Sequence, residues 1–268
     1  MIEGREMNRL TIIKIGGEVL DNPRRLSTSL AAFAAMTGDK ILVHGGGRMA
    51  SDLCMKLGIS PRFIEGRRVT DAETLKVVQM VYAGLLNKNI VSELQSLGCN
   101  ALGMTGADAN SILAVKRPAT PVDYGYAGDI KEINGNLIIR ILKLNLVPVF
   151  CPLTHDGRNQ YLNTNADTIA ARLGAALAFL FEVGIVYCFG KKGVLENELD
   201  ENSVIDSISE KSFQDLKQRK IVKNGMVPKL ENAFQALQGG VNTVRIIHSD
   251  ALAGLSQGKA EGTLITLG

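Results

Sequence analysis

Two lysines stand where an isolated positive charge is unusual. Lys14 interrupts TIIKIGG (11–17), an otherwise apolar run, and Lys229 follows Pro228 at the expected start of a helix. A lysine on a buried strand must reach solvent or meet an anion, and a lysine at a helix N-terminus opposes the helix dipole. Lys229 alone could equally be an exposed surface side chain, but the two lysines together predict a site that handles an anion.

Glycine turns could supply the backbone of such a site. Expected strands are followed by glycines at 16–17 and 45–47, and Gly193 follows Lys191 and Lys192. Open α/β sheets bind ligands at the carboxyl ends of their strands, where bare N–H groups form an anion cradle. The turns match neither the dinucleotide nor the Walker pattern, so these two standard cradles are excluded. Any one turn by itself could be only a tight corner.

Five further polar residues have a structural explanation beside a functional one. Asp167 fits the first turn of a helix as an acid that complements the dipole, and Asn163 and Asn165 fit a turn and an N-cap. Arg68 can clamp a carboxylate or remain a surface charge. His44 has no partner in sequence and is expected to be structural.

The combined inventory favours one class of reaction. No Ser-His-Asp or Cys-His order and no HExxH pattern suggests itself, and no metal site is expected. Cations, N–H donors and an acid are what phosphoryl transfer needs, because the protein supplies little covalent chemistry to that reaction.

The composition is that of an ordinary globular protein. Of 268 residues, 46% are hydrophobic and 21% are charged, and the net charge of +3 is too small to indicate nucleic-acid binding. The densest basic segment, KQRKIVK (217–223), is interpreted as a solvated surface. The cysteines lack metal-binding spacing, so we expect buried free thiols in a reducing, cytoplasmic compartment. They are Cys54, Cys99, Cys151 and Cys188.

Neither the N-terminus nor any internal segment is expected to enter a membrane. MIEGREMNRL (1–10) has no apolar core for a signal peptide, and IEGR at 2–5 resembles a protease-site remnant that would make Met7 the natural start. The apolar segment at 173–190 is interrupted by Glu182, so it is interpreted as a helix end that leads into a buried strand.

Short β-branched runs alternate with helical patterns along the chain. This alternation predicts a mainly parallel sheet covered by helices on both faces, with two lobes that share the sheet. Strands are expected at 10–16, 40–46, 100–106, 146–153, 179–189, 241–248 and 262–267, and helices at 25–37, 49–57, 71–95, 165–178 and 228–237.

Local signals refine three of these elements. Thr70 and Glu73 form a capping-box pattern before the helix at 71–95. An Asn-Gly pair within 123–138 predicts a hairpin turn, and Pro228 suits the first position of the last long helix.

Five ordered motifs show that the chain resembles the acetylglutamate kinases of the amino acid kinase family. The resemblance extends from about residue 10 to the C-terminus. The motifs are IIKIGG (12–17), VHGGG (43–47), GRRVTD (66–71), LNTNAD (162–167) and GMVPKLENA (225–233), with DYGYAGDI (123–130) and EGTLIT (261–266) as further matches.

The resemblance implies a fold and an activity. The fold would be an open three-layer αβα sandwich, one continuous domain of two lobes. Residues 1–170 would bind N-acyl-L-glutamate and contribute to dimerisation, and residues 171–268 would bind Mg-ATP. The γ-carboxylate would attack the γ-phosphate of ATP to form an acyl phosphate, the second step of arginine biosynthesis. A carboxylate is ionised near pH 7, so no general base is needed.

The resemblance also implies roles for single residues. Lys14 and Lys229 would stabilise the transferring phosphoryl group, and Asp167 would hold both ammonium groups in place. Arg68 would clamp the substrate α-carboxylate and Asn163 would bind the acyl-glutamate. Backbone N–H groups would bind the phosphate and the attacking carboxylate, from Gly16, Gly17, Gly45 and Gly46.

One motif departs from the family. A Thr/Ser-Asp pair usually follows the C-lobe strand, whereas Phe189 and Gly190 stand here. This puts the contact with ATP in doubt, and we hypothesise that Lys191 or Lys192 reaches the nucleotide phosphates, with Gly193 beside them.

Regulation and substrate choice leave alternatives open. The relatives that arginine inhibits carry a long extra N-terminal helix that links dimers into hexamers. Only about nine residues precede the first strand here, so we expect an arginine-insensitive homodimer with the 71–95 helix at or near its interface. N-acetyl-L-glutamate is the leading substrate, and N-succinyl-L-glutamate or another N-acylglutamate is the alternative. A non-catalytic ligand-binding member is the alternative from another class, although retention of both lysines and the aspartate argues against it.

Overall fold

An eight-stranded sheet forms the middle of the molecule. The computed structural model describes residues 8–223, 225–255, 259 and 261–268, so the question of a start at Met7 lies outside it. The strands, in spatial order, are β12 (Ser207–Ser209), β14 (Thr263–Thr266), β13 (Thr243–His248), β11 (Phe181–Phe189), β1 (Asn8–Ile15), β2 (Asp39–His44), β8 (Val147–Phe150) and β5 (Ala101–Met104). Only β12 and β14 run opposite to the other six, which confirms the mainly parallel sheet.

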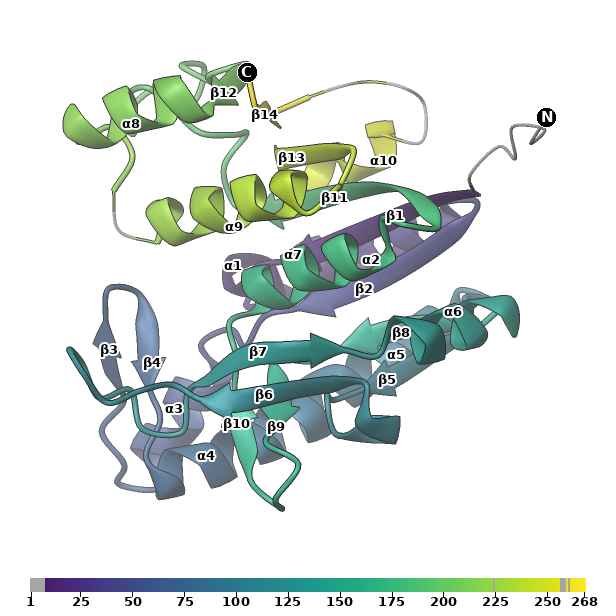
Figure 1. Cartoon of the computed structure of the whole chain (residues 1–268), viewed down its shortest axis with the longest axis vertical. Helices are drawn as coiled ribbons and strands as arrows, with labels where there is room; N and C mark the ends of the chain where they lie inside the picture. The colour runs from purple at the N-terminus through teal and green to yellow at the C-terminus, as the bar shows by residue number, and fades with distance from the viewer. Residues whose placement is uncertain (1–7, 224, 256–258, 260) are drawn as a thin grey trace.

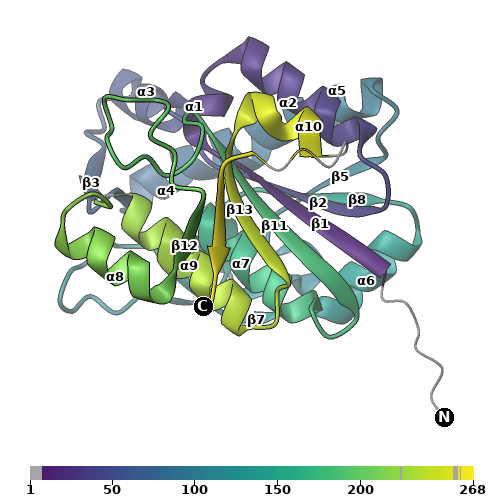
Figure 2. The same ribbon diagram turned by 90° about the horizontal axis from the view of Figure 1, so that it is seen from above.

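Helices cover both faces of this sheet (Figure 2). One face is covered by α6 (Gly135–Lys143), α7 (Ala166–Leu177) and α9 (Met226–Gln238), and the other by α2 (Pro23–Ala35), α5 (Asn87–Ser96) and α10 (Leu252–Leu255). Strand β1 shows why, because Leu10 and Ile12 pack in one core while Ile13 and Ile15 pack in the other. Lys14 shares the face of Ile12 and therefore points toward α7 and α9.

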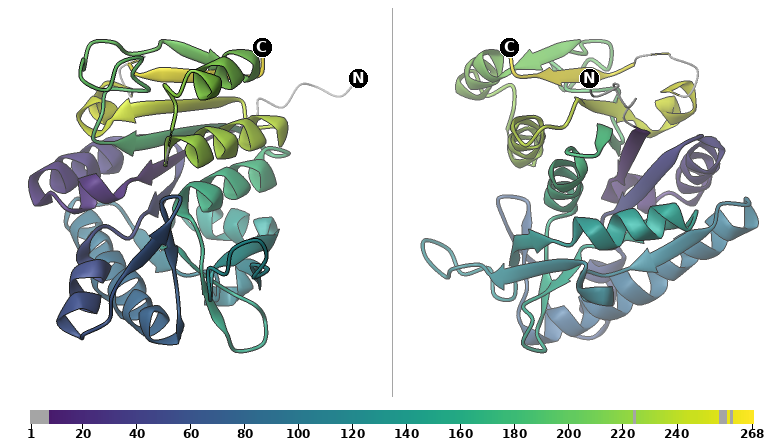
Figure 3. Two further views of the ribbon diagram at one scale, coloured as in Figure 1. Left: turned by 90° about the vertical axis from the view of Figure 1, so that its left-hand side faces the viewer. Right: turned by 45° about the vertical axis from the view of Figure 1, so that its right-hand side comes forward.

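The expected boundary between the lobes falls inside a helix. Helix α7 runs through residue 170, and the central sheet is continuous across both halves. Figures 1 and 3 show the C-terminal third, coloured green to yellow, at one end of the molecule and the blue to teal segments at the other. The remaining short elements of the C-terminal part are α8 (Glu210–Gln218) and η3 (Ser249–Ala251).

The N-terminal half carries a second, four-stranded sheet that was not foreseen as a unit. Its strands, in spatial order, are β10 (Tyr161–Asn163), β9 (Leu153–His155), β6 (Ile112–Lys116) and β7 (Gly128–Ile133), with η2 (Asp108–Asn110) before β6. The hairpin turn expected at the Asn-Gly pair within 123–138 does not form. Strand β7 pairs with β6, and Asn134 is instead the N-cap of α6, its side chain accepting from the Leu137 N–H.

A separate hairpin, β3 (Arg62–Ile64) and β4 (Arg67–Val69), follows α3 (Met49–Lys56) and stands beside α4 (Ala72–Val78) (Figure 1). The long helix expected at 71–95 is confirmed as one helical path through α4, a π-helix η1 (Gln79–Leu86) and α5. The predicted capping box of Thr70 and Glu73 is wrong, because Asp71 is the N-cap, and its side chain accepts a hydrogen bond from the Thr74 N–H at 2.8 Å.

Three smaller expectations can also be compared with the structure. Helix α9 begins at Met226, so Pro228 is its third residue and still lies in the turn whose N–H groups need no helical partner. All four cysteines are buried and free, and no helix in the described ranges is long and apolar enough to cross a membrane. The segment at 173–190 is the end of α7 followed by the buried strand β11.

Candidate active site

The candidate site lies where the central parallel strands end together. Lys14 near the end of β1 is level with Val43 of β2 and Tyr187 of β11. The glycine turns that follow β1 and β2 therefore meet at one edge of the sheet, and Cα of Gly47 would lie 3.3 Å from a Cβ placed on Gly17. Carboxyl ends of parallel strands are the usual ligand sites of open α/β sheets.

Lys14, Asp167 and Lys229 come together at this edge. Nζ of Lys14 lies 2.7 Å from Oδ1 of Asp167, and Nζ of Lys229 lies 3.0 Å from Oδ2. The three residues are only 7%, 8% and 8% exposed and come from β1, α7 and α9. Both lysines thus meet an anion, and one carboxylate holds two ammonium groups.

The electrostatics of the cluster favour its charged form. Burial raises the pKa of the Asp167 carboxyl, but the two neighbouring ammonium groups outweigh burial and hold this pKa well below its ordinary value. Burial lowers the pKa of Lys229 to about 8, although Asp167 opposes the change. The Lys229 ammonium also lies 5.2 Å and 5.9 Å from the ring centroids of Tyr187 and Phe189. Near pH 7 the cluster presents two cations around one anion.

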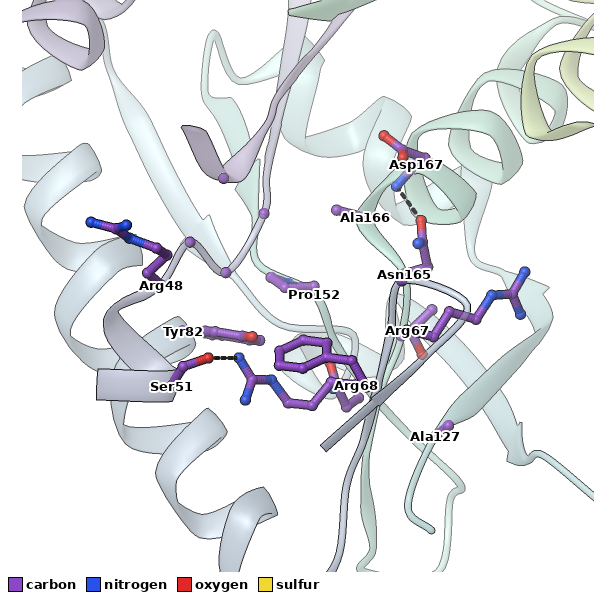
Figure 4. A pocket seen from close by; sticks show the side chains of 18 of the residues that line it. Arg48, Ser51, Arg67, Arg68, Tyr82, Ala127, Pro152, Asn165, Ala166 and Asp167 are labelled. Atoms are coloured by element: carbon purple, nitrogen blue, oxygen red, sulfur yellow. Dashed lines mark hydrogen bonds between the residues drawn. The ribbon is translucent and has the colours of Figure 1, made fainter. Parts of the chain in front are cut away.

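A cavity of about 390 Å³ opens beside this cluster (Figure 4). Seven of the residues expected at the site line it, namely Lys14, Gly17, Gly45, Gly46, Arg68, Asn163 and Asp167. Gly16 and Lys229 are next to this set without lining the cavity, and Lys191, Lys192 and Gly193 are also absent from the lining.

The backbone donors differ from the expected set. The N–H groups of Gly16 and Gly45 donate at 2.9 Å to carbonyls of Cys188 and Ile15, because each glycine continues a strand ladder. These two amides are therefore already used. Within the described residues the N–H groups of Gly17, Gly46 and Gly47 make no hydrogen bond, so they are free donors at the cavity.

Close packing against neighbouring residues also requires glycine in the 45–47 turn, whether or not a ligand binds there. A Cβ on Gly46 would overlap the ring of Tyr82, which is buried beneath the turn. Gly47 has φ +57°, and a Cβ there would lie 2.7 Å from Oδ1 of Asp21, which accepts from the Arg48 N–H. The turn is therefore held in one conformation before any substrate arrives.

Arg68 is buried with half of its guanidinium unused. Its Nη2 donates to Oγ of Ser51 at 2.7 Å, and the guanidinium stacks on Phe63 at 4.6 Å from the ring centroid. Its Nη1 is buried and has no hydrogen-bond partner among the described residues. A buried guanidinium without an acidic partner among the described residues, in a cavity wall, is suited to an anionic ligand.

The two asparagines have different local roles. Asn165 is the N-cap of α7 and accepts from the N–H groups of Asp167 and Thr168, so it fixes the start of the helix that carries the central acid. Nδ2 of Asn163 donates to Oγ1 of Thr70 at 3.0 Å, which orients the amide at the cavity wall.

His44 behaves as a structural residue. It is fully buried, its Nδ1 lies 2.7 Å from the carbonyl oxygen of Gly45, and its Nε2 lies 3.1 Å from Nδ2 of Asn87. Burial lowers its pKa to about 4, so the ring stays neutral near pH 7. Its place beneath the glycine turn supports the expectation that it is no general base.

The family departure at Phe189 and Gly190 has a local counterpart. A Cβ on Gly190 would overlap the carboxylate of Glu18, so an aspartate at 190 would meet a like charge there. In the following loop, Nζ of Lys191 lies 3.8 Å from Oε1 of Glu198, and Lys192 donates to Asn202. Gly193 is buried, and a Cβ on it would lie 2.7 Å from Oγ1 of Thr263.

Sequence reasoning missed several residues that line the cavity. The sequence did not indicate that Tyr82 and Ser51 line the cavity, because their positions in the helical patterns are typical of ordinary core and surface residues. Arg67 could have been noticed, because it stands beside Arg68 in the motif GRRVTD. Further lining side chains are Glu18, Asp21, Arg48, Phe63 and Arg117.

Comparisons with known proteins agree with the fold. A model of the amino acid kinase family matches residues 9–248. An acetylglutamate kinase of Phocaeicola vulgatus is 52% identical over 244 residues, which cover 91% of this chain and 95% of the relative. An acetylglutamate kinase of Cytophaga hutchinsonii is 48% identical over 259 residues, covering 96% and 98%. A solved structure from Streptococcus mutans has a TM-score of 0.79 at 27% identity, covering 97% of this chain and 99% of that one.

Proposed function

The chain belongs to the amino acid kinase family, and we propose that it phosphorylates the γ-carboxylate of N-acetyl-L-glutamate with ATP. The Asp167 carboxylate held between two buried lysines, at the end of a cavity lined by Arg68, is the observation that carries this proposal. The relatives named acetylglutamate kinase supply the acceptor. The step belongs to amino-acid biosynthesis, and we assign it to the second step of arginine formation.

The reaction needs no proton transfer from the protein. A γ-carboxylate oxygen forms a bond to the γ-phosphorus of ATP, in line with the bond from that phosphorus to the bridging oxygen. The latter bond breaks, and the bridging oxygen leaves as part of ADP. Both reactants are anions, so the barrier contains their repulsion. Lys14 and Lys229 offset this repulsion, and Asp167 keeps both ammonium groups in place.

The cavity orients the acceptor from both ends. Arg68 in the cavity wall binds the α-carboxylate, while Asn163 binds the acyl-amide portion. The unused N–H groups of Gly17 and Gly46 bind the attacking carboxylate and the phosphoryl group. This places the γ-carboxylate near Lys14, which is the arrangement that an in-line attack requires.

ATP approaches from the side of the C-terminal lobe. The end of β11 and the start of α9 lie there, and Lys191 or Lys192 reaches the nucleotide phosphates. Mg²⁺ enters with ATP and is held by its phosphates. Among the described residues no group of three His, Cys, Asp or Glu side chains is arranged to hold a metal ion.

The protein works as a cytoplasmic homodimer that arginine does not inhibit. The helical path α4–η1–α5 carries Met80 and Leu85 as exposed apolar side chains, 54% and 49% exposed, which suits an interface between two copies. Four buried free thiols suit a reducing compartment. Light scattering with and without arginine tests the oligomer and its regulation.

The decisive experiment follows ADP release with N-acetyl-L-glutamate in wild type and in Lys14→Ala. Wild type should turn over at least about 10²-fold faster, the usual loss for one preorganised charge or donor. Equal rates in the two proteins would refute the kinase proposal. Lys191→Ala and Lys192→Ala test the nucleotide side, and an unchanged KM for ATP in both would refute their assigned role.

A further inference from the structure

Two of the cations that line the cavity have no acidic partner among the described residues. Five basic and three acidic side chains line it. Lys14 pairs with Asp167, and Arg48 and Arg117 pair with Asp21 and Asp129. The two remaining cations, Arg67 and Arg68, have no acidic partner among the described residues.

An N-acetyl-L-glutamate would use only one of these two guanidinium groups. Its γ-carboxylate goes to the lysines and its α-carboxylate to Arg68, whose free Nη1 is buried. The acetyl group is neutral and ends in a methyl, so it gives Arg67 nothing to pair with. A lining guanidinium without hydrogen bond or ion pair in the described part of the chain indicates a third anionic group.

Arg67 and Arg68 face different parts of the cavity. They are consecutive on β4, so their side chains leave the strand on opposite sides. Figure 4 shows the guanidinium of Arg68 beside Ser51 and that of Arg67 directed away from it. Arg67 shares the cavity wall with Ala127, whose backbone is bridged to that of Asn163.

Ala127 contributes only a methyl side chain to this part of the wall. It is a small residue beside Asn163, which receives the acyl amide in the proposed function. An acyl chain that leaves the amide there would extend along the wall that Ala127 shares with the half-buried Arg67. A terminal carboxylate two carbons beyond the acyl carbonyl, as in a succinyl group, fits both features.

We propose that the acyl end of the cavity recognises a second carboxylate through Arg67, so that the enzyme takes N-succinyl-L-glutamate and uses it more efficiently than neutral acyl-glutamates. This inference rests on the proposed function, because it needs the α- and γ-carboxylates to be placed by Arg68 and the lysines. It adds a specificity-determining residue outside the catalytic cluster.

The test compares N-succinyl-L-glutamate with N-butyryl-L-glutamate, which has the same acyl length but a methyl group in place of the carboxylate. Wild type should prefer the succinyl compound by about tenfold in kcat/KM, the lower end for a charge-assisted hydrogen bond, since solvent partly screens Arg67. Arg67→Gln should remove the preference for the succinyl over the butyryl compound. Arg67→Lys should keep part of the preference because it retains the charge.

Arg62→Gln is the matched control, because Arg62 is an exposed arginine on the same hairpin and does not line the cavity. It should keep the full preference. Equal use of succinyl and butyryl compounds by an enzyme active on N-acetyl-L-glutamate would overturn this inference alone. So would a rise in the KM for ATP in Arg67→Gln with every acceptor, since Arg67 would then serve the nucleotide. No Lys14-dependent ADP release with any acceptor would overturn the proposed function and this inference together.

Discussion

The lowered pKa of Lys229 predicts that activity and stability change in opposite directions as the pH rises. Burial brings this pKa from its ordinary value of 10.5 to about 8, against the opposing effect of Asp167. Only the protonated amine can stabilise the transferring phosphoryl group. With both substrates well below their KM, kcat/KM reports the free enzyme, so it should fall above pH 8 by about tenfold per pH unit. At high pH, kcat/KM should level off at a value about 10²–10³-fold below that at pH 7.

Stability should follow the opposite course across the same range. Between pH 8 and 10.5 the unfolded chain keeps a proton on Lys229 that the folded protein has released. The unfolded state then binds more protons, so the free energy of unfolding rises with pH through this window. A pKa difference of this size corresponds to about 3 kcal/mol. Urea unfolding at pH 7.5 and pH 10 measures the change.

Lys229→Arg provides the matched comparison. A guanidinium stays charged throughout, so the variant should be slower but lose the decline in kcat/KM above pH 8. Lys211→Arg, an exposed lysine on α8, should keep the wild-type profile. A wild-type kcat/KM that stays level up to pH 10, or an identical decline in Lys229→Arg, would refute the reasoning.

Further variants test the rest of the site. Asp167→Asn leaves two buried ammonium groups without their anion, so the free energy of unfolding at pH 7 should fall by about 3–5 kcal/mol, and an unchanged urea midpoint would contradict this. Gly46→Ala should lower the free energy of unfolding by about 1–3 kcal/mol, because the added methyl group would overlap the Tyr82 ring. Gly45→Ala has 3.5 Å to its nearest neighbour, so it should fold normally, but its methyl would lie 3.6 Å from the nitrogen of the free Gly17 N–H and should lower kcat; full activity would show that the turn is only structural. Arg68→Gln should raise the KM for the acyl-glutamate by about 10- to 100-fold with that for ATP unchanged, and equal rises in both would contradict its role as a carboxylate clamp.

Elements with a strong local pattern were predicted well. Strands at 10–16, 40–46 and 179–189 are buried on both faces, so they appear as continuous apolar runs whatever their neighbours are. The helices at 71–95 and 165–178 have apolar stripes long enough to be recognised without caps. Their positions therefore follow from local sequence.

Details that depend on competing local partners were predicted less well. Thr70 was expected to cap a helix, but its hydroxyl donates to the Arg68 carbonyl and accepts from Asn163, which leaves the cap to Asp71. Asn134 was expected in a hairpin turn and caps α6 instead, because β7 finds its partner in β6. In each case a contact from a distant segment decided between two local possibilities.

The sequence by itself determined the inventory of the site. A lysine inside an apolar strand cannot be left without an anion, and bare glycines at strand ends indicate close approach of a ligand or another backbone, so Lys14 and the turns at 16–17 and 45–47 could be chosen from residue types alone. Only the tertiary structure decided which partners they meet. Asp167 and Lys229 are 153 and 215 positions from Lys14, and no local pattern encodes an ion pair between segments so far apart. No local pattern encodes the packing of Gly46 against Tyr82 either, or the strand hydrogen bonds that occupy the N–H groups of Gly16 and Gly45. Such contacts arise from strand order and helix packing, which bring the carboxyl ends of β1, β2 and β11 together.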